Sequence, residues 1–348
     1  MAGDVSRFAF LNAKLRTRIG VMLPDNLFLS IRRSGSLAAG LSLLAGTPYS
    51  RLTGDLETVE GELLAEEIRD LSGIIKGLTG PVEQYASSLM ERYIIELLKR
   101  ALRAVFSRQV LHVDPPVIPI EPAADLFPRL PLRKIAEAGN LDEAEELLAG
   151  RIYGGVVKEE KDTVLNTGSL FPLENSLDIL FYRLVLKALE LLSDRDREIA
   201  GRMTGLEIDI HNLSRIYRFT ESLSLPTEKA LTFLIPGGYK VQTAGLKKTL
   251  SSGRPRDRLT EYAASLFPGF DTLLSGKTSE TFGRLALFDS ILETLLDREI
   301  RKVLLGNPFT VGILPAYTIL KRREIRNLVS ALNSAAYGSS HDEKAASL

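Results

Sequence analysis

Residues 173–192 read LENSLDILFYRLVLKALELL. Apolar side chains recur here every three or four positions, so they share one face of a helix with 3.6 residues per turn; they are Leu173, Leu177, Leu180, Phe181, Leu184, Ala188 and Leu191. Similar windows fill most of the chain, whereas alternating strand-like runs bounded by turns are nearly missing. The sequence therefore predicts an all-α protein with little or no β-sheet.

Composition narrows the classes of function. The 348 residues are enough to bury a core, and 44 Lys and Arg balance 44 Asp and Glu. A neutral chain lacks the long-range attraction that holds nucleic acid or an anionic membrane surface. Cysteine is absent, which excludes disulfides, thiolate catalysis and cysteine-ligated metal, and fits a reducing cytoplasm.

Neither an export signal nor a membrane-spanning segment is expected. The first 18 residues, MAGDVSRFAFLNAKLRTR, carry five charges and no apolar run of signal-peptide length. The longest uncharged stretch, residues 303–320, contains Gly306, Pro308 and Pro315. That stretch predicts a turn followed by a new helix.

Internal repeats organise the chain. Breaks gather at residues 114–131, which hold six of the 16 prolines, and from Pro226 to Arg258, dividing the chain into three similar lengths. Apolar anchor pairs recur at spacings of 114 or 115 residues: Val59 with Leu63, Leu173 with Leu177 and Leu287 with Ile291, then Ile95 with Leu98, Ile210 with Leu213 and Ile325 with Leu328. We predict helical repeats at 1–112, 113–225 and 226–338, followed by a mobile tail at 339–348.

Two further echoes accompany the anchors. LLAGTPY at 43–49 resembles LLAGRIY at 147–153, and LLSGKT at 273–278 is a looser match. Asn212 and Asn327 occupy matching helical positions, where asparagine costs about half a kcal/mol against alanine, and a hydrogen bond to a neighbouring loop is the preferred explanation. Periodicity leaves an open solenoid and a closed cup as alternatives, but a unit of 115 residues favours small bundles closed around a pseudo-threefold axis.

SGKT at 275–278 is a lookalike of a phosphate-binding loop. The pattern GxxxxGK[ST] requires glycine where Asp271 stands, and Leu273 and Leu274 occupy positions where backbone amides would cradle phosphate. A solvated turn between helices is therefore preferred to a nucleotide site at Lys277.

Glu207 and His211 have the i,i+4 spacing of two metal ligands on one helix. Asp209 is near in sequence but turned away, and the remaining histidines are His112 and His341. No third ligand is evident, so we prefer a polar pair on a solvated face. No catalytic, cofactor-binding or metal-binding residue is predicted, and signatures such as GxSxG or GxGxxG are missing.

Charge clusters are interpreted as surface features. Asp194 and Asp196 alternate with arginines and predict a self-compensated surface cluster. Basic clusters have few aromatic neighbours, which predicts solvated faces or protein contacts and no nucleic-acid binding; they are Lys14, Arg16 and Arg18, then Arg254, Arg256 and Arg258, then Lys321, Arg322 and Arg323.

Six motifs together resemble the C subunit of V/A-type ATP synthases, the counterpart of the d subunit of eukaryotic vacuolar ATPases. They follow the family's order along nearly the whole chain: FAFLNAKLRTRIGVML at 8–23, TPY at 47–49, LENSLD at 173–178, EIDIHNLSRIYR at 207–218, LIPGGYK at 234–240 and ILKRREIRNL at 319–328. Three departures stand out. The first repeat lacks the asparagine-leucine pair, Phe288 replaces the acid of Glu60 and Glu174, and residues 114–131 are unusually proline-rich.

The resemblance implies a funnel or socket of three helical bundles around a pseudo-threefold axis. It implies a non-catalytic, cofactor-free rotor subunit, peripheral on the cytoplasmic face of the membrane. Such a subunit receives the tip of the D–F central shaft, contacts the membrane proteolipid ring and transmits torque. The contact residues, the coupled ion and the net direction of ATP turnover are not assigned.

Two other classes of function are alternatives to the rotor subunit. One is a helical scaffold that binds soluble partners. The other is an all-helical hydrolase using Lys277 or the face that carries Glu207 and His211, which predicts nucleotide or metal binding by the isolated chain.

Overall fold

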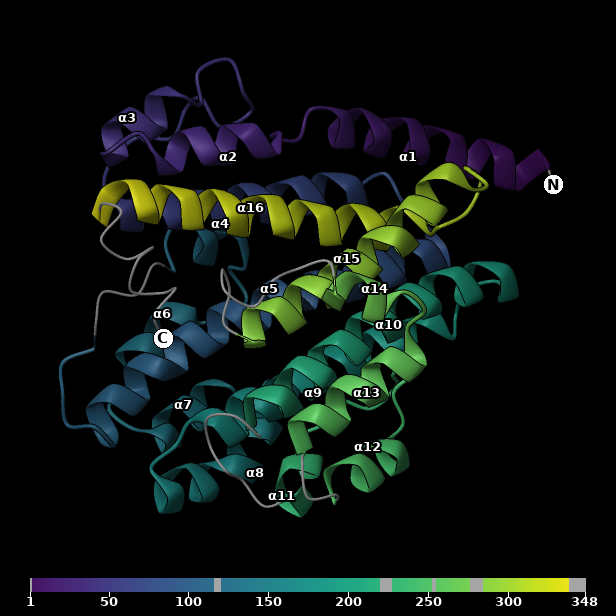
Figure 1. The fold of residues 1–348 in the computed structure, drawn as a ribbon. Coiled ribbons are helices and arrows are strands. Elements are labelled where there is room, and N and C mark those ends of the chain that lie inside the picture. The colour runs from purple at the N-terminus through teal and green to yellow at the C-terminus, as the bar shows by residue number, and fades with distance from the viewer. Residues whose placement is uncertain (1, 116–119, 220–226, 252–254, 276–283, 338–348) are drawn as a thin grey trace. The chain divides into compact units, whose positions relative to one another are not determined.

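The computed structural model describes residues 2–115, 120–219, 227–251, 255–275 and 284–337 (Figure 1). Every regular element in these ranges is helical, so the predicted all-α class is confirmed. The longer helices are α1 Ala2–Gly20, α4 Leu56–Ile75, α5 Gly80–Gln109, α8 Ile152–Thr167, α9 Phe171–Leu189, α10 Asp194–Arg218, α13 Pro255–Leu266, α15 Arg284–Leu305 and α16 Ile313–Tyr337. The shorter ones are α2 Asp25–Arg32, α3 Leu37–Ser42, the 3₁₀ helix η1 Ala123–Leu126, α6 Leu132–Glu137, α7 Leu141–Leu147, α11 Thr227–Thr232, α12 Thr243–Leu250 and α14 Phe270–Ser275.

Local sequence signals set the ends of several helices. The side chain of Asp55 accepts a hydrogen bond from the Thr58 amide at 2.8 Å and caps the start of α4. Ser193 caps α10 in the same way through the amide of Asp196. Gly168 follows α8 with φ of 62°, a left-handed conformation that favours glycine and ends the helix.

Contacts between Cα atoms divide the chain into two compact units. The described residues of unit 1 fall within 2–15 and 189–317, and those of unit 2 fall within 16–188 and 318–337. The predicted division at 112, 225 and 338 concerns sequence repeats, and it stays a prediction.

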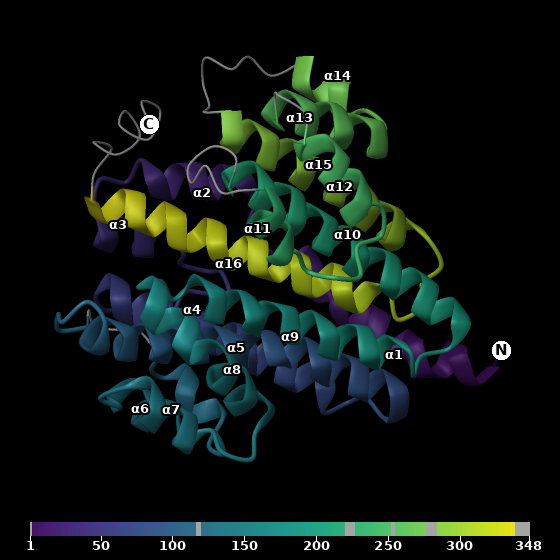
Figure 2. The ribbon, with the colours of Figure 1, turned by 90° about the horizontal axis from the view of Figure 1, so that it is seen from below.

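Unit 1 is built around α10, which packs against α15 and α13 (Figure 2). Aromatic rings join the helices: Tyr217 of α10 stacks on Phe288 of α15 with centroids 4.7 Å apart. Phe270 of α14 meets Phe288 edge-on at 5.6 Å. These ring contacts link α10, α14 and α15.

Unit 2 joins segments from opposite ends of the sequence, and α16 lies alongside α2 and α4 (Figure 1). One core cluster contains buried residues of the first 63 positions together with four from α16: Leu23, Phe28, Ile31, Leu44, Tyr49, Val59 and Leu63 with Ile325, Leu328, Ala331 and Leu332. Burial of this apolar surface therefore depends on residues more than 260 positions apart in the sequence.

The predicted anchor pairs fall on three pairs of long helices. Val59, Leu173 and Leu287 lie on α4, α9 and α15, and all three are buried. The later anchors lie on the following helices α5, α10 and α16, where Leu98, Leu213 and Leu328 are fully buried. Each predicted repeat thus contains two consecutive long helices whose apolar faces carry the repeated residues.

The uncharged stretch at 303–320 forms a turn followed by a helix, as predicted. Helix α15 ends at Leu305 and α16 begins at Ile313. Within the described ranges, no helix is both long and apolar enough to cross a bilayer.

Candidate functional site

Three polar contacts recur between the long helices. Glu174 of α9 accepts from Arg103 of α5 at 2.6 Å, and Asp289 of α15 pairs with Arg218 of α10 at 3.1 Å. Glu60 of α4 accepts from Asn333 of α16 at 2.9 Å. The donors Arg103, Arg218 and Asn333 are spaced by 115 residues.

The order of these contacts is cyclic. In each contact, the first long helix of one predicted repeat bonds to the second long helix of the repeat before it. Repeat 2 bonds to repeat 1, repeat 3 to repeat 2, and repeat 1 to repeat 3 through α4 and α16. Helix α16 therefore completes the series.

Asp289 corrects one expectation from the sequence. The repeat alignment places Phe288 opposite Glu60 and Glu174, which suggests that the acid is lost. In the structure the neighbouring Asp289 takes the acidic role, pairing with Arg218 and accepting from the Ser214 hydroxyl at 2.6 Å. Phe288 instead packs on Tyr217, because adjacent helical positions differ by about 100° in direction.

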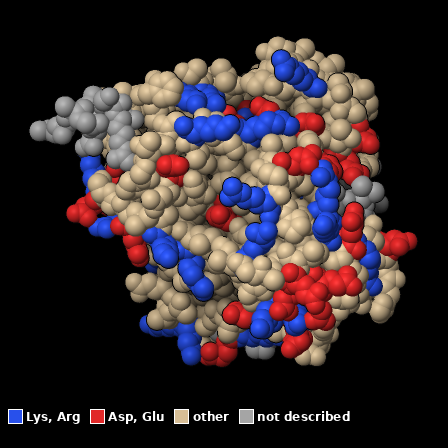
Figure 3. Space-filling model, turned by 180° about the vertical axis from the view of Figure 1, so that it is seen from behind, with Lys and Arg blue, Asp and Glu red and all other residues tan. Residues whose placement is uncertain are grey.

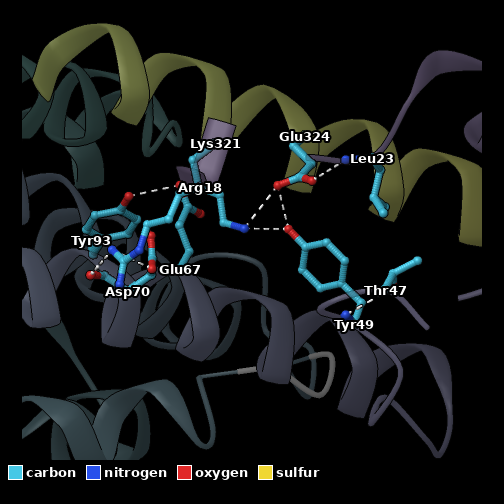
Figure 4. Close-up of polar contacts among 9 residues, drawn as sticks. All are labelled: Arg18, Leu23, Thr47, Tyr49, Glu67, Asp70, Tyr93, Lys321 and Glu324. Carbon is cyan, nitrogen blue, oxygen red and sulfur yellow. Dashed lines mark hydrogen bonds and ion pairs between the residues drawn. The ribbon is translucent and has the colours of Figure 1, made fainter. Parts of the chain in front are cut away.

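Glu324 of α16 is the centre of a buried polar cluster in unit 2 (Figure 4). One carboxylate oxygen accepts from the Leu23 backbone amide at 2.7 Å, and the other accepts from the Tyr49 hydroxyl at 2.6 Å. Lys321 donates to the Tyr49 oxygen at 2.6 Å and to Glu324 at 3.0 Å. Because both oxygens of Glu324 are engaged, the cluster fastens α16 to the turn before α2 and to the loop after α3.

Two further pairs extend the polar region in Figure 4. The Tyr93 hydroxyl of α5 donates to Glu67 of α4 at 2.9 Å, and Arg18 of α1 forms an ion pair with Asp70 of α4 at 2.7 Å. Burial raises the pKa of Glu67, although the charges of Arg322 and Lys321 oppose the shift. Burial also raises the pKa of Tyr93, so its hydroxyl keeps the proton that it donates.

Asp209 of α10 holds the LIPGGYK loop in unit 1. Its carboxylate is fully buried and accepts from the amides of Lys240 at 2.7 Å and Val241 at 3.0 Å. Burial raises the pKa of Asp209 to about 6, against the opposing effect of the backbone hydrogen bonds. Asp209 and Glu324 lie 115 residues apart, and each binds the backbone of a turn just before a short helix.

Asn212 confirms the predicted hydrogen bond to a neighbouring loop. Its amide donates to the Ile235 carbonyl at 2.8 Å and accepts from the Ile235 amide at 2.9 Å. Asn212 and Asp209 therefore fix both ends of the loop on one face of α10. For Asn327 the same expectation stays a prediction.

The similar motifs LLAGTPY and LLAGRIY also adopt a similar backbone conformation at their glycines. Gly46 and Gly150 adopt left-handed backbone conformations with φ of 79° and 73°. The tyrosine that follows is buried in each copy; Tyr49 donates to Glu324, and Tyr153 donates to Glu91 of α5. Two carboxylates on second long helices thus bind tyrosines of matching motifs.

The structure describes only some of the catalytic and metal candidates. In SGKT, residues 276–278 lie outside the described residues, as do His341 and the tail at 339–348. Glu207 is half-buried and His211 exposed, whereas Asp209 is buried on another face of α10 and serves the loop. Among the described residues, no group of three or more His, Cys, Asp or Glu could hold a metal ion.

Only one of the paired acids is a surface residue. Asp194 is 95% exposed and pairs with Arg197, as predicted. Asp196 is buried, and its carboxylate accepts from the Val311 amide at 2.9 Å and from the Ser193 hydroxyl at 3.0 Å. The surface interpretation was therefore wrong for Asp196, because the turn before α16 covers it.

The described residues of the basic clusters have different environments. Arg18 and Lys321 belong to the polar cluster of unit 2, whereas Arg258 pairs with Glu261 on an exposed face. Over the face in Figure 3, Lys and Arg are interspersed with Asp and Glu. Sequence reasoning assigned no role to Glu324, Asp289 or Asp209; the 115-residue spacing that links Asp209 to Glu324 could have identified both.

The chain is similar to known proteins over most of its length. Residues 11–345 match the family described as ATP synthase (C/AC39) subunit. The chain belongs to this family. It is 24% identical over 332 residues to the C subunit of the A-type ATP synthase of Methanothermobacter thermautotrophicus, covering 93% of this chain and 83% of that protein.

Two other relatives match over similar lengths. The C subunit of the A-type ATP synthase of Methanocaldococcus jannaschii is 22% identical over 340 residues, with 94% of this chain and 82% of that protein covered. The C subunit of the A-type ATP synthase of Halorubrum lacusprofundi is 24% identical over 342 residues, with coverage of 96% and 95%. The similarity therefore spans all three predicted repeats.

Proposed function

We propose that the chain is a non-catalytic central-stalk subunit of a V/A-type rotary ATPase or ATP synthase. It couples the D–F central shaft to the membrane proteolipid ring and transmits torque during ion transport and ATP synthesis or hydrolysis. The family match over residues 11–345 carries this proposal. The subunit acts at the cytoplasmic face of the membrane as a peripheral component of the complex.

The proposed arrangement is three bundles around a pseudo-threefold axis, with repeats at 1–112, 113–225 and 226–338. The cyclic contacts of Glu60, Glu174 and Asp289 support it, because each predicted repeat is fastened to another in the same way. The buried cluster around Glu324 supports it as well, since it ties the last long helix to the first repeat. A torque-transmitting protein needs such fastened helices because close-packed interiors transmit strain.

Affinity capture from detergent-solubilised membranes tests the proposal. The full chain serves as bait, the affinity tag alone serves as the control, and recovered proteins are identified by mass spectrometry. Joint recovery of proteolipid with the D and F shaft proteins is the expected outcome. Recovery of soluble partners alone would replace the rotor function with that of a general helical scaffold.

Separate binding experiments distinguish the two proposed contacts. Purified D–F and the detergent-solubilised proteolipid ring are each titrated with the full chain. The coupling role requires that D–F and the ring each bind the chain, and that all three form one complex when they are mixed. Binding of only one component would contradict the coupling role.

A further inference from the structure

A cavity of about 480 Å³ lies in unit 1 between α10, the LIPGGYK loop, the end of α13 and α15. Its volume is within the range of small-molecule sites. Four buried side chains supply an apolar wall: Leu206, Phe267, Leu295 and Leu296. The cavity therefore offers a place where an apolar group could leave water.

Basic residues surround this apolar wall. Arg202, Lys240, Arg298 and Lys302 line the cavity with a single acid, Glu299, which leaves three positive charges in excess. Glu299 pairs with Lys302 at 2.5 Å and lies 3.9 Å from Arg202. The whole chain is neutral, so this local excess differs from the average surface.

Two of the cations donate hydrogen bonds to backbone carbonyls, and the charge of Lys240 also acts on the buried Asp209. Lys240 donates to the Leu266 carbonyl at 2.7 Å and lies 5.2 Å from the centre of the Phe267 ring. Arg298 donates to the Pro268 carbonyl at 3.5 Å. A carboxylate or phosphate oxygen would form a stronger, charge-assisted hydrogen bond with either cation.

Hydrogen bonds within the protein itself hold the loop that carries Tyr239 and Lys240. The Tyr239 amide donates to the Gly205 carbonyl at 3.2 Å, and Asp209 accepts from the next two amides. Because this side of the cavity is already ordered, less conformational entropy is lost when a ligand binds.

We propose that this cavity binds an amphipathic organic anion, a carboxylate or phosphate joined to an apolar body of medium-chain acyl size. The apolar body lies against the leucines and Phe267, and the anionic group meets Lys240 and Arg298 at the rim. The proposal is independent of the rotor function, because the isolated full chain is sufficient for binding.

The test uses decanoate as the probe and compares it with neutral decanol and cationic decyltrimethylammonium. Isothermal titration calorimetry of the full chain gives the affinities, and backbone amide NMR shifts locate the site. Decanoate should bind about tenfold more tightly than decanol, and the difference should shrink as salt increases. The largest shifts should fall at residues 202–210, 239–240 and 295–302.

Paired variants separate the rim charges from general electrostatics. Lys240→Gln with Arg298→Gln should weaken decanoate binding about tenfold and leave decanol binding unchanged. Lys248→Gln with Arg301→Gln is the matched control, because it removes two exposed cations of the same unit that do not line the cavity. Equal affinities for decanoate and decanol, equal losses in both variants, or shifts centred elsewhere would overturn the proposal.

Discussion

Gly205 lies in the interior of α10, where glycine is normally unfavourable. A Cβ at this position would lie 2.9 Å from the Tyr239 Cβ and 3.0 Å from the Tyr239 backbone nitrogen. The missing side chain therefore allows the LIPGGYK loop to approach the helix. A Cβ at Gly201, one turn earlier, would contact only the Leu189 side chain, at 3.9 Å.

Alanine at the two glycines should change stability in opposite directions. Gly205→Ala should lower the free energy of unfolding by roughly 1–3 kcal/mol, because the loop backbone must move. Gly201→Ala should raise it by about 0.5–1 kcal/mol, since the position has ordinary space and alanine favours the helix. Urea denaturation followed by circular dichroism measures both, and a shared sign would contradict the close-approach explanation.

Asp209 should make the stability of unit 1 depend on pH. Its folded-state pKa of about 6 lies above the ordinary value of 3.8. The folded state therefore binds the Asp209 proton more tightly than the unfolded state does. This difference stabilises the fold, and its contribution to the free energy of unfolding is complete below about pH 4. That contribution is lost as pH rises through 6, with a total on the order of 3 kcal/mol.

Carboxyl carbon NMR of Asp209 should give a titration midpoint near pH 6. Unfolding measured from pH 4 to 7 should show the corresponding slope in the natural chain. Asp209→Asn should lack this component because it cannot titrate there. A midpoint near 4 would show that the backbone hydrogen bonds fully offset the effect of burial.

Equivalent positions on the long helices perform equivalent tasks. Arg103, Arg218 and Asn333 each contact the first long helix of another predicted repeat, which is α9, α15 and α4 respectively. Asp209 and Glu324 each hold a turn that precedes a short helix. Asp289 shows that the task can move by one residue while the helix pairing persists. The predicted repeats thus share contacts between elements more than they share identical residues.

Glu324→Gln tests how firmly α16 is fastened. Removing one partner of a buried, hydrogen-bonded pair leaves Lys321 uncompensated and should lower the free energy of unfolding by about 3 kcal/mol. Glu62→Gln, which alters the exposed contact with Arg69, should change it by less than about 0.5 kcal/mol. Hydrogen exchange at the Leu23 amide should accelerate only in Glu324→Gln, and equal effects of the two variants would refute a special role for Glu324.

At the scale of the molecule, unit 2 depends on both ends of the sequence. Ile325, Leu328, Ala331 and Leu332 of α16 complete an apolar core formed by residues from Leu23 to Leu63. A chain that ends at Tyr317 loses all four side chains and exposes the surface that they cover.

Truncation after Tyr317 should therefore increase proteolysis within residues 16–75 and increase binding of an apolar dye. A separate peptide of residues 313–337 should restore protection when added in excess. In the full chain, Leu328→Ala should cost about 2–5 kcal/mol, whereas Leu305→Ala at an 88% exposed position should cost less than about 0.5 kcal/mol. Undiminished protection of the truncated chain would show that the first repeat folds without α16.

The amino-acid sequence by itself determined the helical class, the repeated anchors, the turn between α15 and α16, and the loop contact of Asn212. These features follow from local periodicity, helix-breaking residues and the cost of asparagine inside a helix. Its motifs also indicated the family.

Only the tertiary structure decided that Asp289 takes the acidic role, that Asp196 is buried and that Glu324 joins Leu23 to Tyr49. It also decided where the basic cavity of unit 1 forms. Periodicity shows which face of a helix is apolar, but it does not show which distant segment covers that face. A shift of one residue turns a side chain by about 100°, so polar partners are fixed only when the helices pack.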